Sequence, residues 1–386
     1  MRFNPLFLKK TIILSSFFAI FSICSPNAKA NSEGVDSAKH AAEHTEQVAE
    51  GHEDAHGKEG EFNATETIME HISDSHDWHL WGDKSFGLPV ILKTDAGLVH
   101  FNSEEFHHDN EGSHVVEANG QRFVRFENKV YYASETANEK GQYLAFVGEH
   151  PTNGKPLDFS ITKNVASMFL SAILLLLIFT SIASSYKNRE GKAPKGFQSL
   201  LEPIIVFVRD EIARPNIGHR YVGYMPFLLT IFFFIWINNL IGLVPIFPGG
   251  ANLTGNIAVT FTLGVISFLV VSFSGNKYYW KHIFAPDVPW WLYPIMLIVE
   301  IIGVLSKPFA LIVRLFANIT AGHIIVLSLI SLIFIFKTMA IAPVSIGFVL
   351  FMYVLELLVA FLQAFIFTML TALFIGTAVE EHHHYD

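Results

Sequence analysis

The feature that most constrains this chain is an apolar run of 47 residues, from Trp290 to Phe336, with ionisable side chains in its interior. About 20 helical residues cross the hydrocarbon core of a bilayer, so the run is either two crossings or one long, strongly tilted helix. A charged side chain at the bilayer centre costs at least ~2.5–3.5 kcal/mol on insertion scales, so it needs a partner, a water-filled cavity or a function. The polar members of the run are Glu300, Lys307, Arg314, Asn318 and His323.

Helical periodicity sorts these side chains onto two faces. Because each residue turns the helix by ~100°, residues seven apart are offset by only ~20°, and Glu300, Lys307 and Arg314 form one stripe. Asn318 lies on the same side, whereas His323 points to the opposite side. Position alone leaves two simpler interpretations open: Arg314 snorkels or neutralises a neighbour, and His323 is a hydrogen-bonded core residue.

A second overlong apolar run, from Ile341 to Val379, carries two polar side chains, Glu356 and Gln363. They are seven residues apart and therefore share one helical face. If the two runs form an antiparallel hairpin, the register that places Arg314 opposite Gln363 also places His323 opposite Glu356. One register then pairs both couples.

This register predicts a turn near residues 338–340. The sequence has its polar break there, at Lys337 and Thr338, and Pro343 follows just beyond. The agreement favours a hairpin whose two helices hold their polar groups at matching heights.

Three segments resemble a known family. They are LSKPFALIVRLFANITAGHII at Leu305–Ile325, LQAFIF at Leu362–Phe367 and the acidic, histidine-bearing C-terminal end, and they are similar to subunit a of the F-type ATP synthase. The resemblance covers roughly Thr162 to His384. It implies a stator subunit that provides two half-channels beside a rotating c-ring and couples proton flow to ATP synthesis.

The resemblance also implies roles for single residues. The family's essential arginine falls on Arg314, and its partner glutamine falls on Gln363. A pair that lines the proton path falls on His323 and Glu356, in that order. Histidine suits a proton relay because its unperturbed pKa is near 6.5. Two family asparagines fall on Asn318 and Asn239.

Two positions depart from the family pattern. Ala317 replaces a glycine that is often found there, and Gly242 stands where some members have an aspartate. At the other end of the stripe, Glu300 is a candidate for the cytoplasmic exit of the path. For Lys307 the plainer interpretation is that its side chain reaches a lipid headgroup.

The resemblance further implies the partners. These are the c-ring subunits, the peripheral-stalk b subunits and the catalytic head of the ATP synthase, together with membrane lipid and the translocated H⁺. The sequence carries no nucleotide-binding signature, so we expect a subunit that is not an enzyme by itself and that needs no cofactor. Two other classes stay open. A proton-coupled transporter would also bury such charges, although the membrane half shows no internal repeat. A periplasmic sensor with a membrane anchor would leave the intramembrane charges unexplained.

Composition agrees with a polytopic membrane protein. Hydrophobic residues make up 51% of the 386 residues, and the mean hydropathy is +0.38. The net charge of −9 is concentrated in the N-terminal part, which argues against a nucleic-acid partner.

The first 30 residues have the layout of a signal peptide, with Lys9 and Lys10 before an apolar core from Thr11 to Cys24. The alternative is an uncleaved anchor, and both place the following residues outside the cytoplasm. Cys24 is the only cysteine. A cleaved mature chain would therefore hold no disulfide and no cysteine metal site.

Residues 31–83 are acidic and rich in histidine, which predicts a flexible segment. Eleven of the 18 histidines lie between His40 and His114. They are either part of a solvated tail or a zinc or copper site, and without cysteine we expect no metal. Residues 84–160 consist of short alternating runs broken by Gly, Asn and Asp, which predict a small β-rich periplasmic module.

Residues 161–380 form the predicted proton-channel domain, all-α, with five transmembrane helices and one interfacial amphipathic helix over Phe197–Ile212. A soluble helix packed on a partner remains the alternative for that last stretch. The first loop of the domain is rich in Lys and Arg, whereas the next, near Pro245–Asn256, has none. The positive-inside rule then places the mature N-terminus in the periplasm and the tail, residues 381–386, in the cytoplasm of a bacterium, with the helices in its inner membrane.

Overall fold

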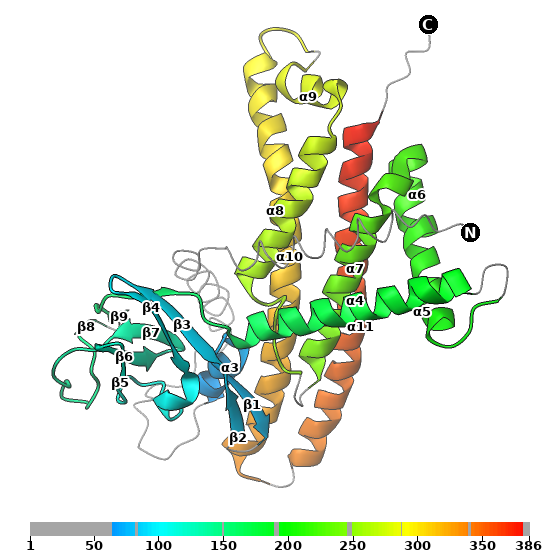
Figure 1. The fold of residues 1–386 in the computed structure, drawn as a ribbon. Helices are drawn as coiled ribbons and strands as arrows, with labels where there is room; N and C mark the ends of the chain where they lie inside the picture. The colour runs from blue at the N-terminus through cyan, green and yellow to red at the C-terminus, as the bar shows by residue number, and fades with distance from the viewer. Residues whose placement is uncertain are drawn as a thin grey trace, which may run out of the picture.

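The computed structural model shows a β-rich module beside a bundle of long helices (Figure 1). It describes residues 64–81, 84–148, 150–188, 193–244, 249–286, 288–338 and 341–380. The predicted signal peptide, most of the histidine-rich segment and the C-terminal tail lie outside the described residues.

The module, residues 64–158, contains the α-helix α3 (Ala64–Ile72), a 3₁₀ turn at Ser103–Phe106 and short antiparallel strands in its described residues. The sheets have the orders β1-β2, β10-β3-β4, β5-β6-β7 and β8-β9. The predicted β-rich character is confirmed, but α3 and β1 precede the expected boundary at residue 84. The strands are β1 (Asp77–Trp81), β2 (Lys84–Gly87), β3 (Pro89–Thr94), β4 (Gly97–Asn102), β5 (Val116–Ala118), β6 (Gln121–Phe126), β7 (Lys129–Tyr132), β8 (Phe146–Val147), β9 (His150–Pro151) and β10 (Leu157–Asp158).

Local turn chemistry explains why these runs become hairpins. Asn119 and Gly120 join β5 to β6, and Glu127 and Asn128 join β6 to β7, all four with positive φ. Two-residue loops with left-handed φ match the twist of the flanking strands. The alternating apolar side chains then meet in one core that includes Val90, Leu92, Phe106 and Phe123.

Among the described residues, five helical stretches are long and apolar enough to cross a membrane, the number that was predicted. The first stretch is α4, and the second runs from α5 through a π-helical turn (Val208–Ala213) and α6 into α7. The helices are α4 (Lys163–Asn188), α5 (Phe197–Phe207), α6 (Arg214–Ile217), α7 (Tyr221–Leu243), α8 (Ile257–Ser274), α9 (Lys277–Phe284), α10 (Tyr293–Phe336) and α11 (Ala342–Val379).

The first overlong run is a single helix, α10, of 44 residues. At ~1.5 Å per residue it is about 66 Å long, against a hydrocarbon core of about 30 Å. A helix of this length remains within the core only if it tilts by about 60° from the membrane normal. Figure 1 shows α4 crossing α7, α10 and α11 at a steep angle, with the module at its first end and α5 at its last. We infer that α4 crosses directly and the bundle lies strongly tilted.

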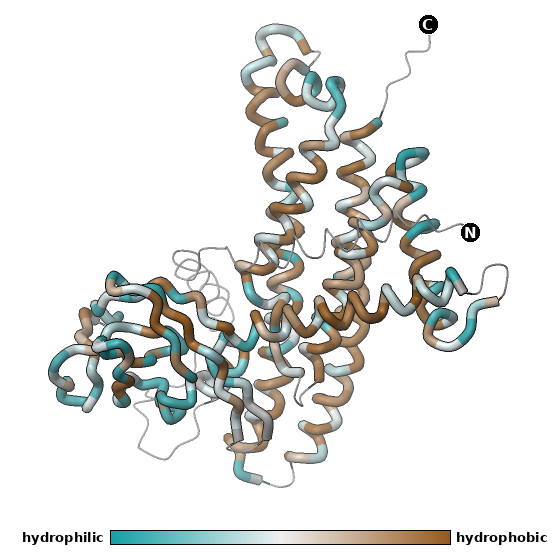
Figure 2. The backbone as a smooth tube through the Cα atoms, in the orientation of Figure 1, coloured by the Kyte–Doolittle hydropathy of each residue, from teal (hydrophilic) through white to brown (hydrophobic). Residues whose placement is uncertain are grey.

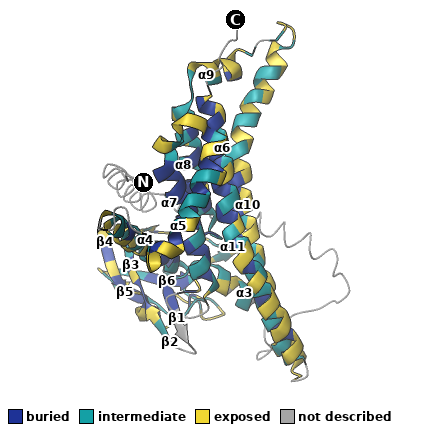
Figure 3. Ribbon diagram, turned by 90° about the vertical axis from the view of Figure 1, so that its right-hand side faces the viewer, coloured by how far each residue is buried: buried dark blue, intermediate teal, exposed yellow. Residues whose placement is uncertain are grey.

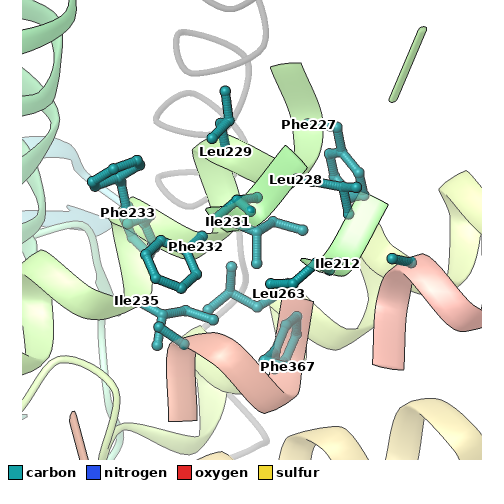
Figure 4. Packing of buried hydrophobic residues seen from close by; sticks show 14 of the residues in the cluster. Ile212, Phe227, Leu228, Leu229, Ile231, Phe232, Phe233, Ile235, Leu263 and Phe367 are labelled. Carbon is teal, nitrogen blue, oxygen red and sulfur yellow. The ribbon is translucent and has the colours of Figure 1, made fainter. Parts of the chain in front are cut away.

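Helix α7 forms the centre of the membrane core. Its apolar side chains pack against α4, the π-helical turn and α11. Figure 4 shows Phe232, Phe233 and Ile235 of α7 gathered with Ile212 and Phe367. In Figure 2 the helices are mostly hydrophobic, and hydrophilic residues gather in the module and at the helix ends.

The predicted amphipathic stripe over Phe197–Ile212, which α5 and the π-helical turn form, is divided between two environments. Leu201, Val208 and Ile212 are buried, while Phe197 and Leu200 are exposed. Exposed apolar side chains at the end of a basic loop suit a helix in the membrane interface.

Candidate functional site

Helices α10 and α11 form an antiparallel hairpin that turns where the sequence predicted. α10 ends at Phe336, Lys337 has a φ of 48°, and α11 begins at Ala342. Along the interface, Ser345 Oγ donates to the carbonyl of Leu329. These contacts give the register of the hairpin.

Glu356 packs directly against the backbone of α10. A Cβ built on Gly322 would lie 2.5 Å from Glu356 Oε1, so the carboxyl occupies the space that glycine leaves free. This places Glu356 within one residue of the predicted register with His323. Glu356 is 7% exposed, and its Oε2 has no hydrogen-bond partner among the described residues.

His323 faces α7 at Gly242. A Cβ built on Gly242 would lie 3.2 Å from the carbonyl oxygen of Ala251 and 3.7 Å from His323 Nε2. Glycine at this position therefore leaves room between α7, the following loop and the imidazole. The structure places His323 and Glu356 on neighbouring helices, but among the described residues it records no ion pair between them.

Asn239 is a buried polar junction between three elements. Its Nδ2 donates to the carbonyl of Ala360 on α11 at 3.3 Å. Its Oδ1 accepts a hydrogen bond from Thr254 Oγ1 in the loop between α7 and α8 at 2.5 Å. Thr254, which is 1% exposed, was not predicted from the sequence. Its loop carries no charged residue that would have marked it as a polar site inside the membrane domain.

Arg314 lies on the outer face of the hairpin and is exposed, as is Asn318. Gln363, by contrast, is buried at 4% exposure, and within the described chain no hydrogen bond is recorded between it and Arg314. Exposed alanines flank Arg314 on the same helical stripe, at Ala310, Ala317 and Ala321. In Figure 3 exposed residues run along the outer side of α10 and α11.

Glu300 and Lys307 lie toward the opposite end of α10. Glu300 Oε1 is 3.9 Å from His282 Nδ1 of α9. Lys307 Nζ lies 5.4 Å from the ring centroid of Phe374 on α11. Lys307 also lines a cavity between α8, α10 and α11, with polar side chains Ser267, Tyr279 and Thr377 in its wall.

The described part of the chain holds no group of three or more His, Cys, Asp or Glu side chains that could bind a metal ion. Four of the histidines considered for metal, His40, His44, His52 and His56, lie outside that part.

The comparisons with known proteins divide the chain as the structure does. A family model described as ATP synthase A chain matches residues 165–376, and a second, described as a domain of unknown function, matches residues 67–159. ATP synthase subunit a of Chloroherpeton thalassium is 51% identical over 234 residues, which are 59% of this chain and 69% of the relative. ATP synthase subunit a 2 of Chlorobaculum tepidum is 49% identical over 236 residues, 59% of this chain and 66% of the relative. The Myxococcus xanthus subunit a is 44% identical over 237 residues, 60% of this chain and 76% of the relative.

Proposed function

The chain belongs to the ATP synthase subunit a family, and from this premise we propose that it conducts protons past a rotating ring of c subunits, with Arg314 separating two half-channels. The same premise makes it a membrane-sector subunit that is not catalytic by itself. Its other proposed partners are the peripheral-stalk b subunits and the catalytic head.

The observation that carries the proposal is the exposure of Arg314 on an apolar outer face. Ile325, about 20° from Arg314 round α10, is 44% exposed, and the neighbouring Val313 is 42% exposed. A guanidinium stays charged at any working pH, and lipid is a costly surrounding for it. A partner helix that carries a carboxylate would cover this face and neutralise the charge.

The alanines beside Arg314 support a close approach of that partner. Small side chains let helix backbones approach each other in membranes, and Ala310, Ala317 and Ala321 lie on the stripe of Arg314. A rotor helix can therefore bring its carboxylate to the guanidinium without a bulky side chain between them.

The proposed mechanism assigns each group a proton task. Arg314 favours the ionised form of each passing rotor carboxylate, so the carboxylate releases its proton to one half-channel before it reloads from the other. The fixed cation also repels a proton that would cross directly. Asn318 is exposed one turn after Arg314 on α10, and Gln363 is buried on α11. Both would orient polar groups near the guanidinium.

The two half-channels are proposed at the two ends of this region. His323, Glu356 and Asn239 would line the one on the module side, and Glu300, beside the cavity that holds Lys307, would line the other. The basic loop after α4 supports a periplasmic module, a cytoplasmic C-terminus and a location in a bacterial inner membrane.

The test is ATP-driven proton uptake by inverted membrane vesicles that carry Arg314→Ala, with assembly measured by co-purification of the complex. We expect uptake to fall to background while the complex stays intact. Lys337→Ala is the matched control, because it removes a cation that is exposed at the turn of the same hairpin. Normal uptake by an intact Arg314→Ala complex would make the proposal wrong.

A further inference from the structure

The β-rich module is docked on the helices that carry the proposed proton path. Trp78 Nε1 donates to the carbonyl of Gly249, in the loop between α7 and α8, at 3.1 Å. On the other side, α3 packs on α10, the helix of His323. The module therefore contacts both the loop between α7 and α8 and the helix that carries His323.

The module also holds the first end of α4. Asp74 Oδ1 accepts from the backbone N–H of Asn164 at 3.1 Å, and Asp74 Oδ2 accepts from Thr162 Oγ1 at 2.8 Å. Lys163 Nζ donates to the carbonyl of His71 in α3 at 3.4 Å. Burial raises the pKa of Asp74 despite these hydrogen bonds.

Four buried polar residues lie at or next to the contacts between the module and the helices, and we call them the seam. Its members are at most 6% exposed: His76, Asn164, Ser167 and Asn252. His76 comes from the module, Asn164 and Ser167 from α4, and Asn252 from the loop between α7 and α8. His76 Nε2 lies 3.1 Å from Asp158 Oδ2, so the end of the seam that lies in the module carries two titratable groups.

Polar atoms along the seam lack protein partners. Within the described residues no hydrogen bond reaches His76 Nδ1, Asn164 Oδ1, Ser167 Oγ or Asn252 Nδ2. Buried polar groups are costly when unpaired, and native proteins commonly satisfy such groups with ordered water. Ser171, one turn further along the same buried face of α4, differs: its Oγ donates to the carbonyl of Met168 at 2.9 Å.

The inner end of the seam reaches the proposed path. Asn252 follows Ala251, whose carbonyl shares the space at Gly242 with His323 Nε2. Two residues later Thr254 donates to Asn239. A proton carried by water along the seam would therefore arrive beside His323 and Asn239.

We propose that protons reach His323 and Glu356 through this hydrated seam, so that the module forms the outer wall of the entrance to the path. The proposal gives the module of unknown function a task in proton access, and it rests on the proposed function of the membrane domain.

Silver ions test the seam, because Ag⁺ is small, travels with water and binds thiolate. The variants Ser167→Cys and Ser171→Cys are made in a Cys24→Ser background, which holds no other thiol. Both serines are 0% exposed, so burial is matched and only the hydrogen bonding of the hydroxyl differs. The purified complex is treated with Ag⁺, reconstituted in vesicles and assayed for ATP-driven proton uptake. The fraction of blocked thiol is measured by alkylation after denaturation.

We expect Ag⁺ to block the thiol of Ser167→Cys and to abolish proton uptake by that variant. Ser171→Cys should keep a free thiol and normal proton uptake after the same treatment. An unmodified Ser167→Cys thiol, a modified thiol with normal uptake, or equal loss in both variants would each overturn the seam as the route. The Arg314→Ala complex separates the two proposals. If that variant loses uptake but Ser167→Cys resists Ag⁺, the membrane path stands and the seam does not.

Discussion

Gly322→Ala is a direct test of how the hairpin holds Glu356. The added methyl carbon would lie 2.5 Å from Oε1, 3.0 Å from Cγ and 3.1 Å from Cδ of that side chain. Because ordinary carbon–oxygen contact needs nearly 3.5 Å, the carboxyl must move by about 1 Å. Its flexible side chain can yield, so we expect a folding cost of about 1 kcal/mol, at the low end for overpacking.

The functional cost should be larger than the folding cost. Proton transfer needs donor and acceptor within about 2.6–3.2 Å, and a displacement of about 1 Å can cost a factor of about 100 in rate. We therefore expect assembled Gly322→Ala complexes to lose proton uptake by about this factor.

Two variants complete this experiment, read out as ATP-driven proton uptake at equal assembly. Gly303→Ala is the matched control on the same helix, because its Cβ would meet nothing within 4 Å, and it should pump normally. Glu356→Asp shortens the displaced side chain by one methylene, so the double variant Gly322→Ala/Glu356→Asp should recover part of the uptake that the alanine alone removes. Equal uptake by Gly322→Ala and Gly303→Ala would refute this reasoning about Glu356.

Two further predictions concern the module. Trp78→Phe keeps an aromatic ring but loses the hydrogen bond to Gly249, so the module should dock more weakly by about 1 kcal/mol. Faster limited proteolysis of the full chain would show this, with exposed Trp291→Phe as the unaffected control; equal rates would contradict it. Burial alone would raise the pKa of Asp158, but the hydrogen bond and charge of His76 hold it below the usual range. The stability from this pair is therefore present above about pH 4 and lost as pH falls through the lower folded pKa. Protease resistance should fall on acidification in wild type and fall less in Asp158→Asn; an unchanged pH profile would argue against the pair.

The sequence alone determined the architecture of the hairpin. Heptad spacing and the length of the two runs fix which side chains share a face, and the polar break at Lys337 and Thr338 locates the turn. Because these properties are local and periodic, they can be read from the sequence without knowledge of the tertiary structure. The same holds for the β-rich module, whose Asn119–Gly120 turn is dictated by backbone conformations that few residues adopt.

Where the ordered module begins was not readable from the sequence. Residues 64–81 share the acidic, histidine-bearing composition of the segment before them, yet α3 packs on α10 and β1 pairs with β2. A short segment of this kind folds only because distant elements supply the surface that buries its apolar side chains.

Only the tertiary structure separated the polar residues by environment. Periodicity places Arg314 and His323 on opposite faces, but packing by α7, α8 and α11 decides that the arginine is exposed and the histidine faces Gly242. The seam is likewise a tertiary product, because Trp78 and Gly249 are far apart in the sequence. Burial and hydrogen-bond partners depend on contacts between remote segments, and a one-dimensional pattern does not contain them.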